Sequence, residues 1–329
     1  MSSTAVRLAR FVARRLAQAI PILVGIAVIN FLFVNMAPGD AADVLAGEAG
    51  AASPEFMADL RERYGLDQPL YVRFFVYIGK LMTLDLGYSF RFSRPVTELL
   101  LAHLWPTLLL MVTAILFAFV MGIVMGVVAA RNVNRWPDYL ISTGALIAYA
   151  TPVFWLGLMM IVLFSVNLGM LPSSGMETIG AGYTGWRRAA DIGLHLIMPA
   201  LVLGMYLTAF EVRLMRASML EVGGQDFVTT ARSKGLGENA IAYRHVLRNA
   251  ILPLVTMLGL QIGAMLGGSV LVETVFAWPG LGRLAYTAVF QRDLNLLLGL
   301  LFMCSLMVII TNIVTEVAYR LVDPRISME

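Results

Sequence analysis

The chain has 329 residues, of which 59% are hydrophobic and only 14% are charged, with a formal net charge of +3. This balance excludes an ordinary soluble domain, in which about a quarter of the residues are charged, and a net charge this small does not suggest nucleic-acid binding. Cys304 is the only cysteine, so no disulfide can form within the chain, and three histidines are too few for a plausible metal cluster.

Six apolar segments are long enough to cross a bilayer core of about 30 Å as helices. The first is too long for the apolar part of a signal peptide and is interpreted as a membrane helix. Basic residues near the span ends gather on the side of the N-terminus, which places both termini in the cytoplasm. The predicted fold is therefore all-α and polytopic, with spans Leu16–Met36, Pro106–Ala130, Tyr139–Leu171, Ile192–Phe210, Ala250–Val272 and Leu294–Thr315.

The segment between the first two spans is too long to be a simple connector and contains more acidic than basic residues. Within it, Ser53 is a suitable N-cap, Pro54 fits the first helical position and Gly65 fits the helix end, so a short helix is expected there. This small extracytoplasmic helical insert could dock an external partner or could simply cover the helix ends.

A basic, glycine-punctuated segment, "DFVTTARSKGLGENAIAYRHVLRNAILPLV", lies between the fourth and fifth spans, over residues 226–255. Asp226 is expected to cap a helix that starts at Phe227, and Gly235 to end it in the left-handed conformation. Its apolar stripe would consist of Phe227, Val228 and Ala231. A second helix after Gly237 would lead into the fifth span along a face containing Ala240, Tyr243, Leu247 and Ala250. The pattern predicts a projecting knob held by two rigid arms; a solvated, positively charged cytoplasmic loop is the alternative.

Several polar residues and glycines lie within or near the spans. Glu211 and Glu316 are expected near the cytoplasmic ends of their spans, where Glu211 can snorkel to water and Glu316 can pair with Arg320. Glu273 is expected at the outer end of its span. His195 is expected to have a structural role. Helix–helix hydrogen bonding is expected for the deeper amides, which could also face a partner or a pathway. Small residues four apart predict close helix approach. The amides are Asn30, Gln261 and Asn312; the glycines are Gly122 and Gly126, then Gly259, Gly263 and Gly267.

Motifs of nucleotide binding and hydrolysis are missing from the sequence. Gly79-Lys80 is followed by Leu81 and lacks the upstream glycine of a phosphate-binding loop, and neither H-E-x-x-H nor G-x-S-x-G occurs. An intramembrane enzyme is therefore disfavoured. A secondary transporter working alone is also disfavoured, because no inverted repeat is visible between the two halves of the chain.

Seven stretches follow one another along nearly the whole chain: "MAPGDAADVLAG", "LRERYGLDQPLYVRFFVYIGKLMTLDLGYSFRFSRPV", "ATPVFWLGLMMIVLFSVNLGMLPSSG", "RASMLEVGGQDFVTTARSKGL", "HVLRNAILPLVT", "ETVFAWPGLGRLAYTAVFQRD" and "NIVTEVAYRLVDPRI". Together they resemble the inner-membrane permeases of the dipeptide and oligopeptide ABC importer family. Thr229-Thr230-Ala231 replaces the E-A-A of the broader importer class, as in the peptide-importing branch. The chain departs from that family's pattern at two places: Glu316 stands where the family usually has Asp, and Gly223 or Gly224 where it has Leu.

The resemblance implies a type I ABC importer permease with three parts: residues 1–36 with the first span, an extracytoplasmic insert at 37–101, and a five-helix transmembrane domain at 102–329 with a coupling loop at about 217–249. Such a permease has no catalytic residue, cofactor site or metal site of its own. Its expected location is the bacterial cytoplasmic membrane, and its expected solutes are di- and oligopeptides, with nickel complexes, glutathione and opines as alternatives.

The expected partners are a homologous permease in a heterodimer, two ATPase subunits that bind ATP and Mg²⁺, and an extracytoplasmic solute-binding protein. The residues expected to couple to the ATPases are Glu221, Asp226, Phe227, Thr230, Ala231, Arg232, Lys234, Gly235, His245 and Asn249.

Overall fold

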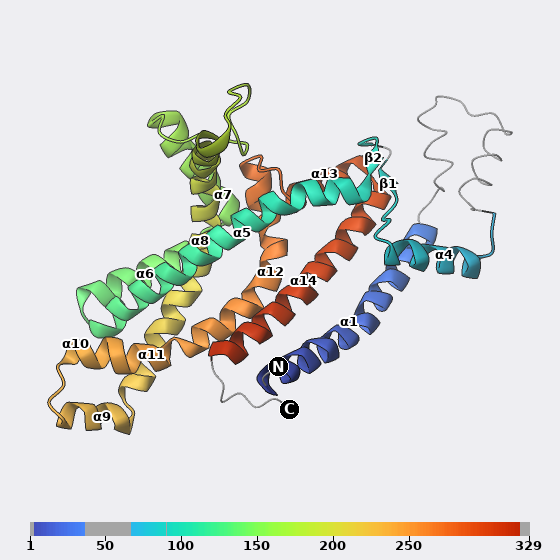
Figure 1. Ribbon diagram of the computed structural model, residues 1–329. Coiled ribbons are helices and arrows are strands. Elements are labelled where there is room, and N and C mark those ends of the chain that lie inside the picture. The colour runs from blue at the N-terminus through green and yellow to red at the C-terminus, as the bar shows by residue number, and fades with distance from the viewer. Residues whose placement is uncertain (1–2, 37–66, 90, 323–329) are drawn as a thin grey trace. The chain divides into compact units, whose positions relative to one another are not determined.

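A computed structural model describes residues 3–36, 67–89 and 91–322 (Figure 1). The helix predicted at 53–65 lies outside the described residues. The described elements are α1 (Ser3–Met36), α4 (Leu70–Met82), β1 (Tyr88–Ser89), β2 (Arg94–Pro95), α5 (Val96–Arg131), α6 (Trp136–Ala150), α7 (Val153–Met160), η1 (Ile161–Asn167), α8 (Gly185–Gly223), α9 (Asp226–Ser233), α10 (Glu238–Ala240), η2 (Ile241–Val246), α11 (Leu247–Ala250), α12 (Leu252–Val275), α13 (Leu281–Gln291) and α14 (Leu294–Val322).

The described part of the chain is mostly helical, which confirms the predicted fold class. Within the described residues, four helices are long and apolar enough to cross a membrane, and a bent pair, α6 with the following α7 and η1, makes up to five. The fifth expected span corresponds to α12, a helix of 24 residues. The count of six spans and the side on which the termini lie stay predictions. The antiparallel pair β1 and β2, two residues each, is a small departure from an all-helical chain.

The third predicted span, 139–171, is not one continuous helix. It breaks after Ala150 and turns by 103° before α7 begins (Figure 1). Pro152 has no backbone N–H, and its ring disfavours the helical conformation for the residue before it. Thr151 accordingly has an extended backbone, with φ −79° and ψ 127°, and its N–H donates to the Ile147 carbonyl as the last bond of α6.

Among the described residues, one compact unit comprises the part of the chain up to residue 103 together with residues 285–313. Ala27, Leu81 and Phe302 form a small core within it. Asn30 is buried and donates to the Leu298 carbonyl at 3.2 Å, which confirms helix–helix hydrogen bonding for this amide. Asp293 caps α14 by accepting from the Leu296 N–H at 3.1 Å.

The second compact unit comprises residues 104–284 and the described residues from 314 onward. The glycines of α5 allow close approach to another helix, as their spacing predicts. Gly122 faces the Glu211 Cβ and Gly126 faces Met215, both on α8. A Cβ on Gly126 would lie 2.5 Å from the Met215 Cβ, closer than real side chains approach. The glycine side of α12, Gly259 to Gly267, lies outside the residues whose side chains are described.

Glu211 does not snorkel to water as predicted. It is fully buried on α8, because Gly122 has no side chain and lets α5 close over it. The pairing of Glu316 with Arg320 stays a prediction, because the Arg320 side chain lies outside the described part.

Candidate functional site

The knob predicted from the sequence is present as α9 and the turn that follows it. The helix begins at Asp226, one residue earlier than predicted, and Gln225 occupies the N-cap position with an extended backbone and no side-chain capping bond. The prediction that Asp226 caps the helix is therefore wrong. Its carboxylate lies in the first turn, where a negative charge still interacts favourably with the helix dipole.

The end of α9 is as predicted. Gly235 has φ +78°, in the left-handed region that favours glycine, and its N–H donates to the Arg232 carbonyl at 2.9 Å. The Leu236 N–H donates to the Ala231 carbonyl at 3.3 Å, so the chain reverses within a few residues. A sharp reversal of this kind keeps the helix short and projecting.

The apolar side of α9 is anchored in the second compact unit. Val228 and Ala231 are buried in a cluster with Met215 and Met219 of α8 and with Val127 of α5. Phe227, predicted to share this stripe, is instead 39% exposed. The two small side chains hold α9 close to the unit, while Phe227 and the polar residues remain accessible.

The second helix departs from its predicted face. After Gly237 the chain forms α10, a π-helical turn in η2 and then α11. The π-turn bonds i to i+5 and shifts the helix face by about one residue. Tyr243 is therefore 52% exposed, and the buried side of this region is formed by Ile241, Val246, Ala250 and Leu254.

An ion pair spans the reversal after α9. The Arg232 guanidinium donates from Nε to Glu238 Oε1 at 2.7 Å and from Nη2 to Oε2 at 3.1 Å. These hydrogen bonds hold the pKa of the Glu238 carboxyl below its usual value and raise that of Arg232. Both side chains are more than half exposed, so the pair fixes the geometry of the turn more than it stabilises the fold.

A third arm, which the sequence interpretation missed, reaches the knob from the end of α5. Arg131 donates from Nη1 to the Tyr243 hydroxyl at 3.1 Å and from Nη2 to Asn239 Oδ1, and its guanidinium lies 5.2 Å from the Tyr243 ring centroid. In the sequence Arg131 is only one of many basic residues that follow a span. No local pattern reveals that it contacts a loop more than 100 residues away.

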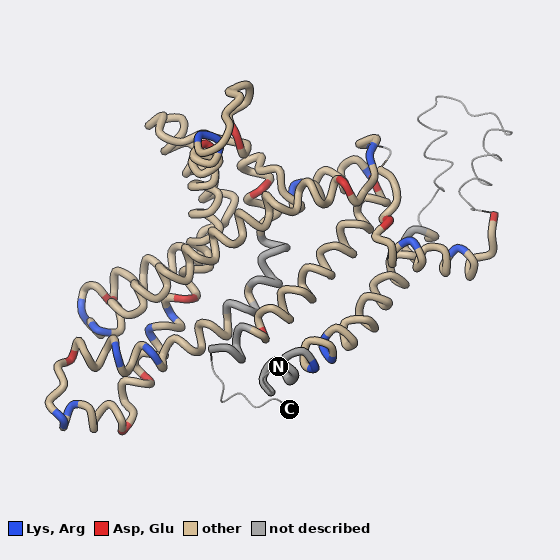
Figure 2. Tube along the Cα trace, in the orientation of Figure 1, with Lys and Arg blue, Asp and Glu red and all other residues tan. Residues whose placement is uncertain are grey.

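The ten residues expected to couple to ATPases therefore lie on one local structure from the end of α8 to α11, a part of the chain that contains several Lys and Arg residues (Figure 2). Ala231 is buried and His245 is half-buried. The exposed members are Glu221, Asp226, Phe227, Thr230, Arg232, Lys234, Gly235 and Asn249.

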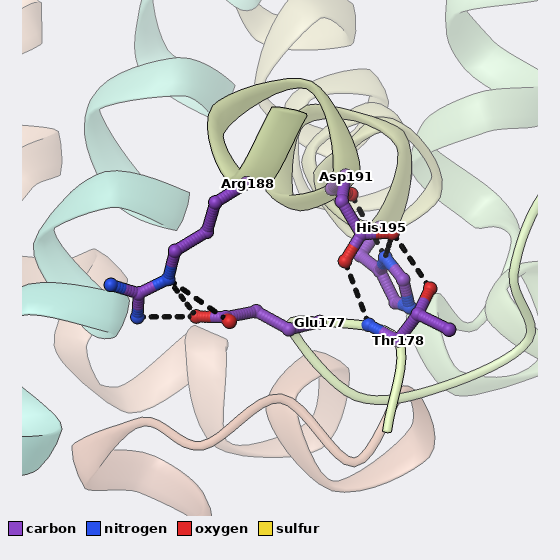
Figure 3. Close-up of polar contacts among 5 residues, drawn as sticks. All are labelled: Glu177, Thr178, Arg188, Asp191 and His195. Atoms are coloured by element: carbon purple, nitrogen blue, oxygen red, sulfur yellow. Dashed lines mark hydrogen bonds and ion pairs between the residues drawn. The ribbon is translucent and has the colours of Figure 1, made fainter. Parts of the chain in front are cut away.

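A second polar cluster lies between η1 and the start of α8 (Figure 3). Arg188 binds Glu177 with contacts of 2.6 to 3.0 Å, and these hydrogen bonds lower the pKa of Glu177. Asp191 accepts from both the backbone N–H and the hydroxyl of Thr178 at 2.7 Å. His195 is buried with Nδ1 2.9 Å from the Asp191 carbonyl, which agrees with the structural role predicted for it.

Glu273 has a larger structural role than its predicted position at a span end suggested. It is fully buried, accepts from the Thr107 hydroxyl at 2.9 Å and from the Arg283 N–H at 2.9 Å, and lies against Gly280. The Thr107 hydroxyl in turn accepts from the Leu281 N–H at 2.7 Å. Within the described residues no group of three or more His, Cys, Asp or Glu side chains is arranged to hold a metal ion.

Comparison with known proteins places this geometry in a family. Residues 122–328 match the family described as "Binding-protein-dependent transport system inner membrane component", and residues 8–112 match the N-terminal domain of such membrane components. The oligopeptide transport system permease protein AppB of Bacillus subtilis is 38% identical over 97% of this chain and 100% of its own length. The glutathione transport system permease protein GsiC of Escherichia coli O6:H1 is 42% identical over 96% of this chain and 98% of its own.

A solved structure supports the fold independently. A chain of the MetNI methionine ABC transporter, in an inward-facing conformation, matches with a TM-score of 0.56 at 20% identity, covering 69% of this chain and 97% of the other. The similarity is to the type I importer fold and says nothing about the solute. The chain belongs to the family of binding-protein-dependent inner-membrane transport components and is a permease of the peptide-type ABC importer group.

Proposed function

We propose that this chain forms half of the membrane pathway of an ATP-driven importer for peptide-type solutes and that α9 transmits the movement of the ATPase subunits to the membrane helices. The observation that carries the proposal is the combination of an exposed outer face on α9 with an anchored inner face. A helix held in this way can dock into a cleft of another protein and cannot move without moving the helices that hold it.

Three connections support force transmission from α9. Gly224 and Gln225 join it directly to α8, Val228 and Ala231 pack against α8 and α5, and the Arg232–Glu238 pair joins it to the helix that leads into α12. A rigid-body change of the membrane helices between two states would follow when two such knobs approach each other. Each knob would belong to one of two homologous permeases.

The solute is a peptide-type molecule in this proposal because relatives of about 40% identity over nearly full length are an oligopeptide permease and a glutathione permease. Both names describe molecules with peptide bonds and free carboxylates. An extracytoplasmic binding protein would deliver the solute, and ATP and Mg²⁺ would bind the ATPase subunits. This division of labour follows from family membership.

The test is co-purification of the ATPase subunits with variants of α9. Phe227→Asp places a charge on the exposed face, and Gly235→Pro imposes a φ near −65° on a residue at +78°. Tyr183→Asp is a matched control, because Tyr183 is 45% exposed in the segment between η1 and α8. We expect both α9 variants to lose ATPase binding and ATP-coupled uptake while the control keeps both. Undiminished binding and uptake in both α9 variants would refute the coupling role.

A further inference from the structure

A column of one guanidinium and two aromatic rings lies on the exposed side of α6 and α8. The Tyr149 and Tyr206 rings are stacked, with centroids 5.7 Å apart and an interplanar angle of 13°. The Arg213 guanidinium carbon lies 4.9 Å from the Tyr149 ring centroid. All three side chains are exposed, with 48% and 40% exposure for the two tyrosines. The column follows α8 for seven residues, or about 10 Å at 1.5 Å per residue.

Arg213 is held in place but its charge is not neutralised. Its Nε donates to the Ala209 carbonyl at 3.1 Å, and its guanidinium carbon lies over the Tyr149 ring. Among the described residues, neither terminal nitrogen of Arg213 meets a hydrogen-bond acceptor or an acidic group. Arg216, three residues further along α8, is the contrast: it binds both carboxylate oxygens of Asp138 at 2.7 and 2.8 Å.

The surroundings of the column argue against a position in lipid. Tyr149 comes two residues before Thr151, where the bent pair α6 and α7 breaks by 103°. Non-helical backbone within a membrane protein's spans is tolerated where it is buried in protein or borders a water-filled cavity, because hydrocarbon cannot satisfy the freed peptide groups. Arg213 lies three residues beyond the expected end of the fourth span at Phe210, so its guanidinium lies near the cytoplasmic edge of the membrane, within reach of water.

The chemistry of the column defines its ligand. A guanidinium with two free terminal nitrogens presents parallel N–H donors that match the two oxygens of a carboxylate. The Ala209 carbonyl and the Tyr149 ring hold the Arg213 side chain, so less conformational entropy is lost when a carboxylate binds. Exposed phenol rings beside it offer flat apolar contact together with hydroxyl groups, which suits a peptide backbone.

We propose that Arg213, Tyr149 and Tyr206 line the solute pathway and that Arg213 binds the carboxylate of a peptide-type solute as it passes. This inference rests on the proposed importer function and adds a solute-contact site to it. Discontinuous membrane helices commonly form such sites, since their ends leave polar groups facing a cavity. An anionic lipid headgroup presents similar chemistry, and the experiment separates it from the solute.

The experiment uses the complete transporter, with its second permease and ATPases, in lipid nanodiscs. Cys304 is replaced by serine, and a single cysteine is introduced at Tyr206, where a charged, water-soluble thiol reagent reports whether the side chain faces water. Val120→Cys on α5, with Val120 54% exposed in an apolar span, is the matched control for a lipid-facing position. The probes are a random tripeptide library with free C-termini and the same library with C-terminal amides.

We expect the reagent to modify the cysteine at position 206 and not that at 120. The free-acid library should slow this modification about tenfold more than the amide library, the ratio produced by one charge-assisted hydrogen-bonded pair. Arg213→Gln should abolish the difference between the libraries, and Arg213→Lys should keep only part of it. Discs of neutral lipid should give the same result as discs containing anionic lipid.

Three outcomes would overturn the inference. An unreactive cysteine at position 206 would place the column against lipid or the partner permease. Equal protection by the two libraries, or protection unchanged in Arg213→Gln, would remove the carboxylate site. Protection that follows anionic lipid instead of peptide would assign the arginine to headgroup binding. Failure of the proposed function is distinguishable, because ATP hydrolysis and ATPase binding are measured in the same discs and do not depend on the label.

Discussion

Thr107 is the best place to test the packing of the second compact unit. Its hydroxyl donates to the buried Glu273 carboxylate at 2.9 Å and accepts from the Leu281 N–H at 2.7 Å. Both Thr107 and Glu273 are essentially inaccessible to water. One hydroxyl therefore joins α5, the end of α12 and the start of α13. Thr107→Val keeps the shape of the side chain and removes both hydrogen bonds.

The expected magnitude follows from the two hydrogen bonds that are lost: the Leu281 N–H is left without a partner, and the Glu273 carboxylate loses one bond while it keeps that from the Arg283 N–H. A buried donor that loses its partner costs about 1–3 kcal/mol and a hydrogen bond to a charged group contributes about 1.5–3 kcal/mol, so the free energy of unfolding should fall by about 2–4 kcal/mol, allowing for non-additivity. By the scaling of soluble domains of similar size, this corresponds to a fall of about 4–16 °C in Tm. Valine adds no bulk, so overpacking does not contribute to the expected loss.

Thr113→Val on the same helix is the control. The Thr113 hydroxyl bonds only the Leu109 carbonyl of its own helix, at 2.8 Å, and this carbonyl keeps its helical hydrogen bond when the hydroxyl is removed. We expect little change in Tm for this variant. The assay is thermal unfolding of the purified permease in detergent, followed by tryptophan fluorescence, with buried Trp278 close to the site through its bond to the Pro106 carbonyl. Equal Tm values for the two valine variants would refute the reasoning.

Other substitutions test separate parts of the structure. Gly126→Ala should destabilise the permease by about 1–3 kcal/mol through overlap with α8, whereas Gly144→Ala, with open space around it, should leave stability equal or higher; melting curves compare them. Asp138→Asn should lower stability by about 1–3 kcal/mol because half-buried Arg216 loses a charged partner, and Asp138→Asn combined with Arg216→Gln should recover part of it in the same melts. The pKa of Glu238 is lowered in the folded protein. Its carboxylate therefore contributes to the order of the turn at every pH above the usual pKa of about 4.3, and this contribution is lost only as the pH falls through the lowered pKa of the folded state. Titration of Glu238 should therefore not change the hydrogen-exchange protection of residues 232–240 between about pH 8 and pH 5. The ion pair would be contradicted if protection fell markedly in that range and the fall were absent in Glu238→Gln.

Local patterns in the sequence were sufficient to identify the membrane class, most helices and the position of the knob. Apolar length predicts a span because every backbone group must be satisfied within its own helix. Gly235 predicts the end of α9 because a left-handed residue is accessible mainly to glycine, and the observed φ is +78°. The spacing of Gly122 and Gly126 predicts close approach to another helix, although it does not identify α8 as that helix.

Only the tertiary structure decided which distant residues meet. Arg131 reaches Tyr243, Thr107 reaches Glu273 and Tyr149 stacks on Tyr206 across sequence separations that carry no periodic signal. The face of the helix after Gly237 was mispredicted for a related reason, since a π-turn changes the repeat of 3.6 residues on which the prediction depended. Burial of Glu211 likewise depends on the side chain that α5 lacks at Gly122. Sequence determines local conformation through each residue's own backbone preferences and apolar length, whereas contacts between helices depend on how all of their surfaces fit together at once.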